Sequence, residues 1–154
     1  MTVAPIRWTR TVDVSPEEAF GVFAERLGEW WPREYTWSGE VLETIAIEPG
    51  EGGRCYELGP HGFHCDWGRV LIWAPGERLV LAWQISPRRE PEPNPAKASE
   101  IEVRFTPIGA GRTQVEFEHR GLDRHGDGGE EYRAALASDA GWPWILARFA
   151  ERCS

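Results

Sequence analysis

The 154-residue sequence has no long apolar run, no cluster of basic residues and few cysteines. No stretch approaches the roughly 18 apolar residues of a membrane-spanning helix, and the beginning, MTVAPIRWTR, lacks the apolar segment of a signal peptide. Asp and Glu number 25 against 17 Lys and Arg, so the chain lacks the basic surface that nucleic acids or anionic membranes require. Three cysteines, an odd number, suit a reducing compartment. We therefore expect a cytoplasmic protein with no nucleic-acid partner and no membrane insertion.

Motifs for several common chemistries are also missing. The sequence contains no phosphate-binding loop, dinucleotide fingerprint, Ser-His-Asp order or helical metal motif. Cys55, His61, His64 and Cys65 lie close together, but their spacing matches no zinc signature, and strand alternation points His64 and Cys65 to opposite faces. We expect no metal and no other cofactor. Cys55 and Cys65 could form a cross-strand pair if they lie opposite each other.

Tryptophan, by contrast, is abundant, with nine residues. Each indole carries a large apolar area and one N–H that needs a partner when it is buried. Two apolar runs, Val70–Trp73 and Leu79–Trp83, flank a turn at Pro75-Gly76 and predict a β-hairpin. Because so many bulky rings are hard to pack solidly, we expect some of them to line a cavity. The alternative is that all of them are ordinary core.

Alternating and apolar segments predict a mainly antiparallel sheet. The predicted strands are Ile6–Val14, Glu40–Glu48, Gly53–Leu58, His64–Trp73, Leu79–Ile85, Ser99–Thr106 and Thr113–Arg120. After the first strand, Ser15 is a predicted N-cap and Glu18 completes a capping box; a second helical piece follows at Glu25–Trp31. The proline-rich segment Ser86–Ala98 is predicted to be an extended, mobile loop.

The end of the chain predicts two helices. The first is Glu130–Ala137, and Ser138-Asp139 can cap the second. In the second, Trp142, Ile145, Leu146 and Phe149 form one apolar stripe. This stripe suits a helix that covers the sheet. We therefore predict a single α+β domain over residues 1–154, in which about seven curved antiparallel strands and two short helices surround a C-terminal helix. A pocket is expected between the sheet and that helix.

The order of these elements resembles the START-like superfamily, which includes the major birch pollen allergen, polyketide cyclases and lipid-transfer domains. Within it, the chain resembles the bacterial AHSA-type or SRPBCC relatives of the activator of heat-shock protein ninety ATPase. The motifs that carry this likeness are Gly52-Gly53-Arg54, Gly68-Arg69-Val70, Pro75–Leu79, Ser99–Phe105, Glu118-His119 and Gly141-Trp142. The resemblance implies a helix-grip fold with an internal cavity. It also implies several roles, since the group includes binding proteins, cyclases and proteins linked to stress.

Candidate site residues follow from strand parity and from the resemblance. His119 shares a face with Phe117 and is predicted to point into the pocket, as an acid or base or a ligand contact; the alternative is a hydrogen-bonded histidine at a strand end. Glu57 shares a face with Cys55, and if that face is inward its expected partner is Arg69 or His119. The predicted ligand-binding residues are Trp30, Trp31, Trp37, Cys55, Trp83, Phe105, Phe117, His119, Trp142 and Leu146.

Three functions are consistent with the sequence. The first is binding of a small apolar or aromatic molecule between the sheet and the C-terminal helix. The second is a cyclase- or dehydratase-like enzyme that uses His119 and Glu57 as catalytic residues. The third, a chaperone-associated interaction module, follows from the resemblance alone. Exposed sheet edges would also allow a homodimer.

Overall fold

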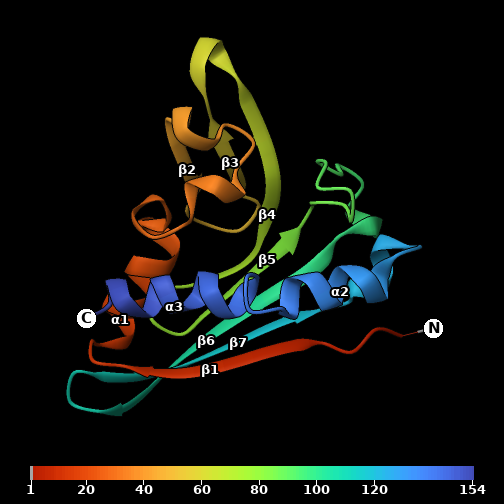
Figure 1. Cartoon of the computed structure of the whole chain (residues 1–154). Helices are drawn as coiled ribbons and strands as arrows, with labels where there is room; N and C mark the ends of the chain where they lie inside the picture. Colours follow the sequence, from red (N-terminus) through yellow and green to blue (C-terminus); the bar gives the residue numbers. More distant parts are fainter. Residues whose placement is uncertain (1) are drawn as a thin grey trace.

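Seven antiparallel strands curl into a half-barrel around the C-terminal helix (Figure 1). The computed structural model describes residues 2–154. The strands are β1 (Ile6–Val12), β2 (Thr44–Ile47), β3 (Arg54–Leu58), β4 (His64–Ala74), β5 (Arg78–Trp83), β6 (Ser99–Gly109) and β7 (Arg112–Arg120). Their order across the sheet is β1-β7-β6-β5-β4-β3-β2, so consecutive strands are neighbours except where β1 pairs with β7. The predicted fold class is confirmed.

The strands differ from the predicted ones mainly at their ends. β2 is shorter than the predicted Glu40–Glu48, because Gly39–Val41 forms a 3₁₀ turn, η4, before the chain reaches the sheet. The pairing of β4 with β5 is interrupted by a shift in register between Val70 and Ile72. Such an irregularity bends a strand, and β4 curves away from the rest of the sheet in Figure 1.

The first helix, α1 (Pro16–Phe20), begins as its sequence predicts. The Oγ of Ser15 accepts a hydrogen bond from the backbone N–H of Glu18 at 3.1 Å, which satisfies one free donor of the first turn. The capping box is not completed, because the carboxylate of Glu18 pairs with Arg26 instead. This salt bridge ties the helix to the segment that follows it.

The chain between α1 and β2 consists of single turns, and the predicted helical piece Glu25–Trp31 does not form. A π-helical turn, η1 (Gly21–Glu25), ends where this range begins, and the range itself holds a 3₁₀ turn, η2 (Leu27–Glu29). A further 3₁₀ turn, η3 (Arg33–Tyr35), follows Pro32. The indole N–H of Trp30 donates to the carbonyl of Val22 at 2.8 Å, which fixes the end of η2 against η1.

The predicted apolar stripe of the C-terminal helix is confirmed. α2 (Gly129–Ala137) leads into α3 (Trp142–Arg152), and all four stripe residues of α3 are buried. The predicted cap of this helix is wrong: its N-cap is Gly141, with no side-chain hydrogen bond. Ser138 instead ends α2, where its hydroxyl donates to the carbonyl of Ala135 at 2.7 Å.

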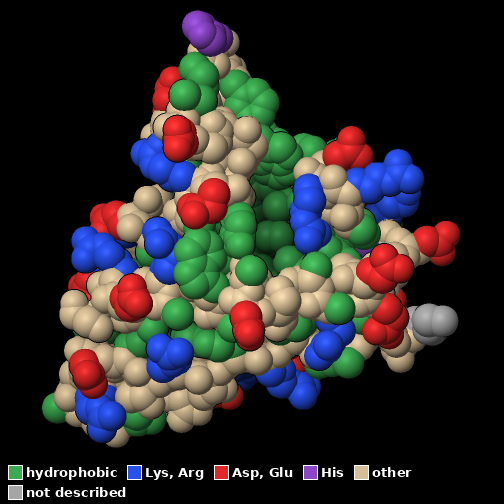
Figure 2. Space-filling model, in the orientation of Figure 1, with side chains coloured by type: hydrophobic (Ala, Val, Ile, Leu, Met, Phe, Trp, Pro, Cys, Tyr) green, Lys and Arg blue, Asp and Glu red, His purple; other side chains and the backbone are tan. Residues whose placement is uncertain are grey.

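Aromatic rings fill most of the space between the sheet and α3. Five indoles form a continuous cluster, with neighbouring ring centroids 5.3 to 6.1 Å apart; they belong to Trp30, Trp31, Trp67, Trp83 and Trp142. The centre of the fold is therefore packed, and a cavity lies toward one end of the half-barrel. The space-filling view shows this as a hollow between the projecting arm of β2, β3 and β4 and the α2 side of the molecule (Figure 2).

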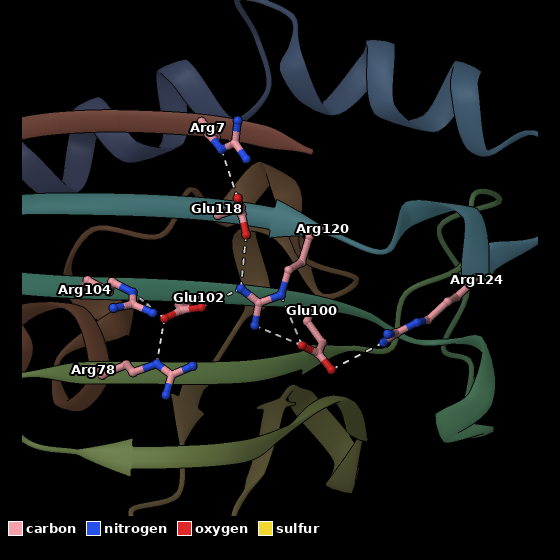
Figure 3. A network of polar contacts seen from close by, with 8 residues as sticks. All are labelled: Arg7, Arg78, Glu100, Glu102, Arg104, Glu118, Arg120 and Arg124. Carbon is pink, nitrogen blue, oxygen red and sulfur yellow. Dashed lines mark hydrogen bonds and ion pairs between the residues drawn. The ribbon is translucent and has the colours of Figure 1, made fainter. Parts of the chain in front are cut away.

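The outer face of the sheet carries a network of arginines and glutamates from β1, β5, β6 and β7 and the following turn (Figure 3). At its centre the carboxylate of Glu102 contacts Arg78 at 2.6 Å, Arg104 at 2.7 Å and Arg120 at 2.5 Å. Burial alone would raise the pKa of Glu102, but its bonds to Arg78 and Arg120 lower that pKa to about 2. The network covers an otherwise open sheet face with side-chain contacts between four adjacent strands.

Candidate functional site

A cavity of about 470 Å³ lies at the open end of the half-barrel. Its wall combines segments far apart in the chain: the turns after η2, the end of β5, the loop after β5, α2 and the start of α3. The wall is mostly apolar and aromatic. The lining residues are Trp31, Glu34, Tyr35, Thr36, Trp37, Trp83, Ile85, Arg89, Tyr132, Ala135, Leu136, Ser138, Ala140, Gly141 and Ile145.

One wall is a short segment, residues 33–38, which we call the strap. The C-terminal end of the strap is held by Glu57, a fully buried carboxylate on β3. Glu57 accepts hydrogen bonds from the backbone N–H of Trp37 (3.1 Å), the backbone N–H of Ser38 (2.9 Å) and the hydroxyl of Ser38 (2.8 Å). The partners predicted for Glu57, Arg69 or His119, are therefore wrong, and three strap donors satisfy the buried charge.

Two hydrogen bonds join the strap to the opposite side of the cavity. The indole N–H of Trp37 donates to the backbone carbonyl of Arg89 at 3.0 Å. The hydroxyl of Tyr35 donates to the carbonyl of Ala140, in the link between α2 and α3, at 2.7 Å. Trp37 and Tyr35 are 39% and 44% exposed, so these bonds lie at the mouth of the cavity and not in its depth.

The loop after β5 is more structured than the predicted extended segment Ser86–Ala98. The backbone N–H of Ser86 donates to the carbonyl of Glu90 at 2.8 Å. The backbone N–H of Arg89 donates to the carbonyl of Ser86, also at 2.8 Å, and the two bonds close a tight turn. Ile85 and Pro91 form a β-bridge below this turn. Arg89 adopts the left-handed conformation, with φ of 62°, which is uncommon outside glycine.

The floor of the cavity is formed by indoles of the central cluster. The N–H of Trp83 donates to the hydroxyl of Tyr132 at 2.9 Å, and that hydroxyl donates to the carbonyl of Ile85 at 2.8 Å. Burial raises the pKa of Tyr132, which keeps the phenol protonated for this arrangement. Trp31 stacks on Trp67 with ring centroids 6.1 Å apart, and the indole N–H groups of both have no hydrogen-bond partner among the described residues.

His119 faces inward, as its parity predicts, but it lies in packed core and not on the cavity wall. The indole N–H of Trp142 donates to its Nδ1 at 3.0 Å, so the proton of the neutral ring sits on Nε2. Nε2 lies 2.7 Å from the Oγ of Ser99, which in turn lies 2.7 Å from Nε2 of His125. Burial, with a smaller contribution from His125, lowers the pKa of His119 to about 3, so the ring is neutral.

Of the ten predicted ligand-binding residues, the cavity wall includes Trp31, Trp37 and Trp83. The others are buried outside the wall: Trp30, Cys55, Phe105, Phe117, His119, Trp142 and Leu146. Neither residue of the predicted catalytic pair, His119 and Glu57, lines the cavity, and each has its own set of partners. Sequence reasoning missed Tyr35, Arg89 and Tyr132, which lie in segments without periodicity or on a helix with little apolar content.

The cysteines are all free thiols. Cys55 pairs in register with Gly68, and Cys65 with Glu57, so the two are not opposite each other and the possible cross-strand pair is not formed. Burial raises the pKa of Cys65 to about 11, which keeps the thiol protonated. His64 is 2.7 Å from Asp66, and no three His, Cys, Asp or Glu side chains group into a metal site anywhere in residues 2–154.

Gly141 sets the distance between the two C-terminal helices. A Cβ at this position would lie only 2.2 Å from the backbone oxygen of Leu136, closer than real Cβ contacts come. Both Gly141 and Leu136 line the cavity, so the helices approach each other at its edge. Only glycine permits this approach.

The curled sheet, the enclosed C-terminal helix and the cavity at one end define a helix-grip protein of the START-like type. The chain belongs to the family of activator of Hsp90 ATPase homolog 1-like proteins, whose model matches residues 13–153. No curated protein matches the chain significantly. Of the part of the chain that the structure describes, no helix is both long and apolar enough to cross a membrane.

Solved structures with the same fold include proteins of different roles. The anthrahydroquino-γ-pyrone synthase Txn09, complexed with SUM, is 38% identical, with a TM-score of 0.68 and 97% of each chain covered. The self-sacrificing resistance protein CalC from Micromonospora echinospora is 28% identical, with a TM-score of 0.65 and coverage of 97% of this chain and 93% of CalC. The Aha1 dimer from Colwellia psychrerythraea is 15% identical, with a TM-score of 0.64 and coverage of 98% and 96%, a likeness of fold alone.

Proposed function

We propose that the protein binds a planar, polycyclic aromatic molecule in the cavity at the open end of the half-barrel. The observation that carries the proposal is the wall itself, where three indoles and the phenol rings of Tyr35 and Tyr132 surround about 470 Å³. Small-molecule sites commonly enclose roughly 300–1,000 Å³ and are lined by apolar and aromatic groups with a few polar ones. Flat aromatic rings offer large stacking surfaces that match a flat ligand.

The comparison with Txn09 supports this ligand class. The two chains are 38% identical over 97% of each, which supports a similar ligand class in addition to the similar fold. The name of Txn09 describes a product that joins a hydroquinone ring system to a pyrone, which is a planar, oxygen-bearing polycycle. A ligand of that class fits a cavity that is aromatic in its depth and polar at its mouth, where Glu34 and Arg89 lie.

A matched pair of helix variants tests the proposal. Ala135 and Ala134 are both exposed positions of α2, but only Ala135 lines the cavity. Ala135→Trp would fill the space, whereas Ala134→Trp would place the same ring on the neighbouring surface. Equilibrium dialysis against 1,8-dihydroxyanthraquinone should show binding to the wild type and to Ala134→Trp, and at least tenfold weaker binding to Ala135→Trp. Equal binding to both variants, or no binding to the wild type, would refute the proposal.

A second candidate is ring closure within the bound molecule, which the 38% identity to a γ-pyrone synthase favours. A γ-pyrone forms when a phenol oxygen adds to the distal carbonyl carbon of a 1,3-diketone and the hemiketal then loses water, with no oxidant required. Glu34 supplies a carboxylate on the wall that would accept the phenol proton and return a proton to the departing hydroxyl. His119 and Glu57 do not reach this space, so the catalytic roles predicted for them are not carried forward.

The conversion of 2-hydroxydibenzoylmethane to flavone and water tests this candidate. The wild type should accelerate the reaction above the rate in buffer, and Glu34→Gln should lose most of the acceleration while still binding the diketone in dialysis. Glu43→Gln, which removes an exposed carboxylate outside the wall, is the control. A wild-type rate equal to that in buffer would leave binding as the only proposed function.

A further inference from the structure

Arg89 is held at the mouth of the cavity by its backbone. Its N–H and carbonyl are both used, the first in the turn to Ser86 and the second as acceptor for Trp37. Its guanidinium lies over the ring of Tyr132, 4.7 Å from the centroid, so the side chain lines the cavity next to a wall residue. Figure 2 shows basic side chains on the rim of the hollow that faces the arm of β2, β3 and β4, where the loop after β5 lies in Figure 1.

The guanidinium of Arg89 forms no salt bridge with the part of the chain that the structure describes. Within residues 2–154, no carboxylate oxygen comes within 4.0 Å of its guanidinium. This contrasts with Arg78, Arg104 and Arg120, which share the carboxylate of Glu102 on the outer face. In a chain with 25 acidic and 17 basic residues, an arginine on a cavity wall without an acidic partner is available to an anion from outside.

The mouth of the cavity also has side chains of opposite charge on its two sides. Glu34 reaches the cavity from the strap, and Arg89 reaches it from the turn after β5, yet the two form no ion pair at 4.0 Å or less. A negative group on a ligand would be repelled near Glu34 and attracted near Arg89. The aromatic floor below them, with Trp83 and Tyr132, accepts the uncharged part of the same molecule.

We infer that the cavity takes an aromatic ligand that carries an anionic oxygen, and that Arg89 binds this oxygen at the mouth while the rings occupy the floor. The inference rests on the proposed binding function and adds the chemical class of the ligand. A guanidinium pairs with a carboxylate through two parallel hydrogen bonds and with a phenolate or enolate through one or two. The face of Tyr132 stabilises the cation when the ligand is absent.

Two probes of nearly equal shape, anthraquinone-2-carboxylate and anthraquinone-2-carboxamide, separate the contribution of the negative charge to the affinity from that of the rings. Arg89→Gln removes the wall cation, and Arg88→Gln removes the adjacent exposed arginine, which does not line the cavity. In equilibrium dialysis the wild type and Arg88→Gln should prefer the carboxylate by about five- to tenfold, a factor typical of one partly exposed charged hydrogen bond. Arg89→Gln should lose that preference and bind the carboxamide within about twofold of the wild type.

A second experiment tests whether a phenolate can supply the anionic oxygen that Arg89 binds. 1,2-Dihydroxyanthraquinone, titrated across its first ionisation, should bind the wild type more tightly when ionised, and Arg89→Gln equally in both forms. Three results would overturn the role of Arg89 while leaving ring binding in place. The wild type would show no preference for the carboxylate, Arg89→Gln would keep that preference, or Arg88→Gln would lose it as fully as Arg89→Gln. If the wild type binds neither anthraquinone, the proposed function itself fails and this inference fails with it.

Discussion

The indole N–H of Trp37 donates to the backbone carbonyl of Arg89 at 3.0 Å and so joins the strap to the turn after β5. The two residues are 52 positions apart in the chain, and both line the cavity. A ligand that enters between these segments has to break the bond first. The contact is therefore expected to control how fast the cavity opens.

We expect Trp37→Phe, which keeps an aromatic ring but removes the donor, to raise both the association and the dissociation rate of 1,8-dihydroxyanthraquinone. One net hydrogen bond of about 1 kcal/mol corresponds to about fivefold in each rate. Stopped-flow fluorescence gives both constants. Tyr35→Phe, which removes the bond to Ala140, should act in the same direction. Trp8→Phe, on β1 and outside the wall, is the control; unchanged rates in Trp37→Phe would show that entry lies elsewhere.

Neighbouring tryptophans should respond differently to the same substitution. Trp30 is 1% exposed and donates to Val22, so Trp30→Phe leaves a void and an unpaired carbonyl, at about 2–4 kcal/mol of unfolding free energy. Trp31 has no hydrogen-bond partner to lose, so Trp31→Phe should cost about 1–2 kcal/mol.

The order should reverse for ligand binding, because Trp31 lines the cavity and Trp30 does not. Urea unfolding and dialysis against 1,8-dihydroxyanthraquinone measure the two effects on the same samples. A larger loss of affinity in Trp30→Phe than in Trp31→Phe would contradict the assignment of the wall.

Glu57 should act on the cavity through the strap. In Glu57→Gln, an amide NH₂ would face backbone donors of Trp37 or Ser38, which leaves at least one buried donor unpaired. We expect a loss of about 1–3 kcal/mol in unfolding free energy together with weaker ligand binding. Glu43→Gln, an exposed carboxylate near β2, should change neither property. Weaker stability with unchanged binding would mean that the strap keeps its place without Glu57.

His119 should make the protein lose stability in mild acid. Burial lowers the pKa of His119 to about 3 in the folded state, against about 6.5 for an unfolded chain, so between these values the unfolded chain binds more protons. Stability is therefore full above about pH 6.5 and falls toward pH 3, by at most about 1.4 kcal/mol per pH unit for one group. Burial also lowers the pKa of His125, which adds to the slope in the same direction.

Urea midpoints at pH 7, 6 and 5 test this expectation, since Glu102, whose pKa is about 2, stays ionised over that range. His119→Gln should flatten the pH dependence while lowering stability at pH 7, and His125→Gln should flatten it in part. An unchanged slope in both variants would assign the acid sensitivity to other groups.

Regular patterning made the sheet and the C-terminal helix predictable. Alternation of Ile101, Val103 and Phe105 identifies the buried face of β6, and the stripe from Trp142 to Phe149 identifies that of α3. Both patterns can be recognised within a short stretch of sequence, without knowledge of contacts to distant residues. The single turns between α1 and β2 were less predictable, because they depend on contacts with distant residues, such as those of Trp37 and Ser38 with Glu57.

A cavity beside the C-terminal helix was predicted, but most of the residues predicted to line it lie elsewhere. Alternation shows which side of a strand His119 and Phe117 occupy, but it does not show whether the space beside them is filled, and here Trp142 fills it. The actual wall depends on contacts between distant segments, such as that of Tyr35 with Ala140. A left-handed arginine in a proline-rich loop gives no periodic signal at all, so the place of Arg89 on the cavity wall follows only from the folded structure.

The close approach at Gly141 has a consequence for how this cavity could change over evolution. Any side chain there would act as a wedge against Leu136 and force α2 away from α3. Because Tyr132 lies on α2, such a wedge would also carry this wall ring away from Trp83. The wall position without a side chain thus fixes how closely α2 approaches α3 at the edge of the cavity.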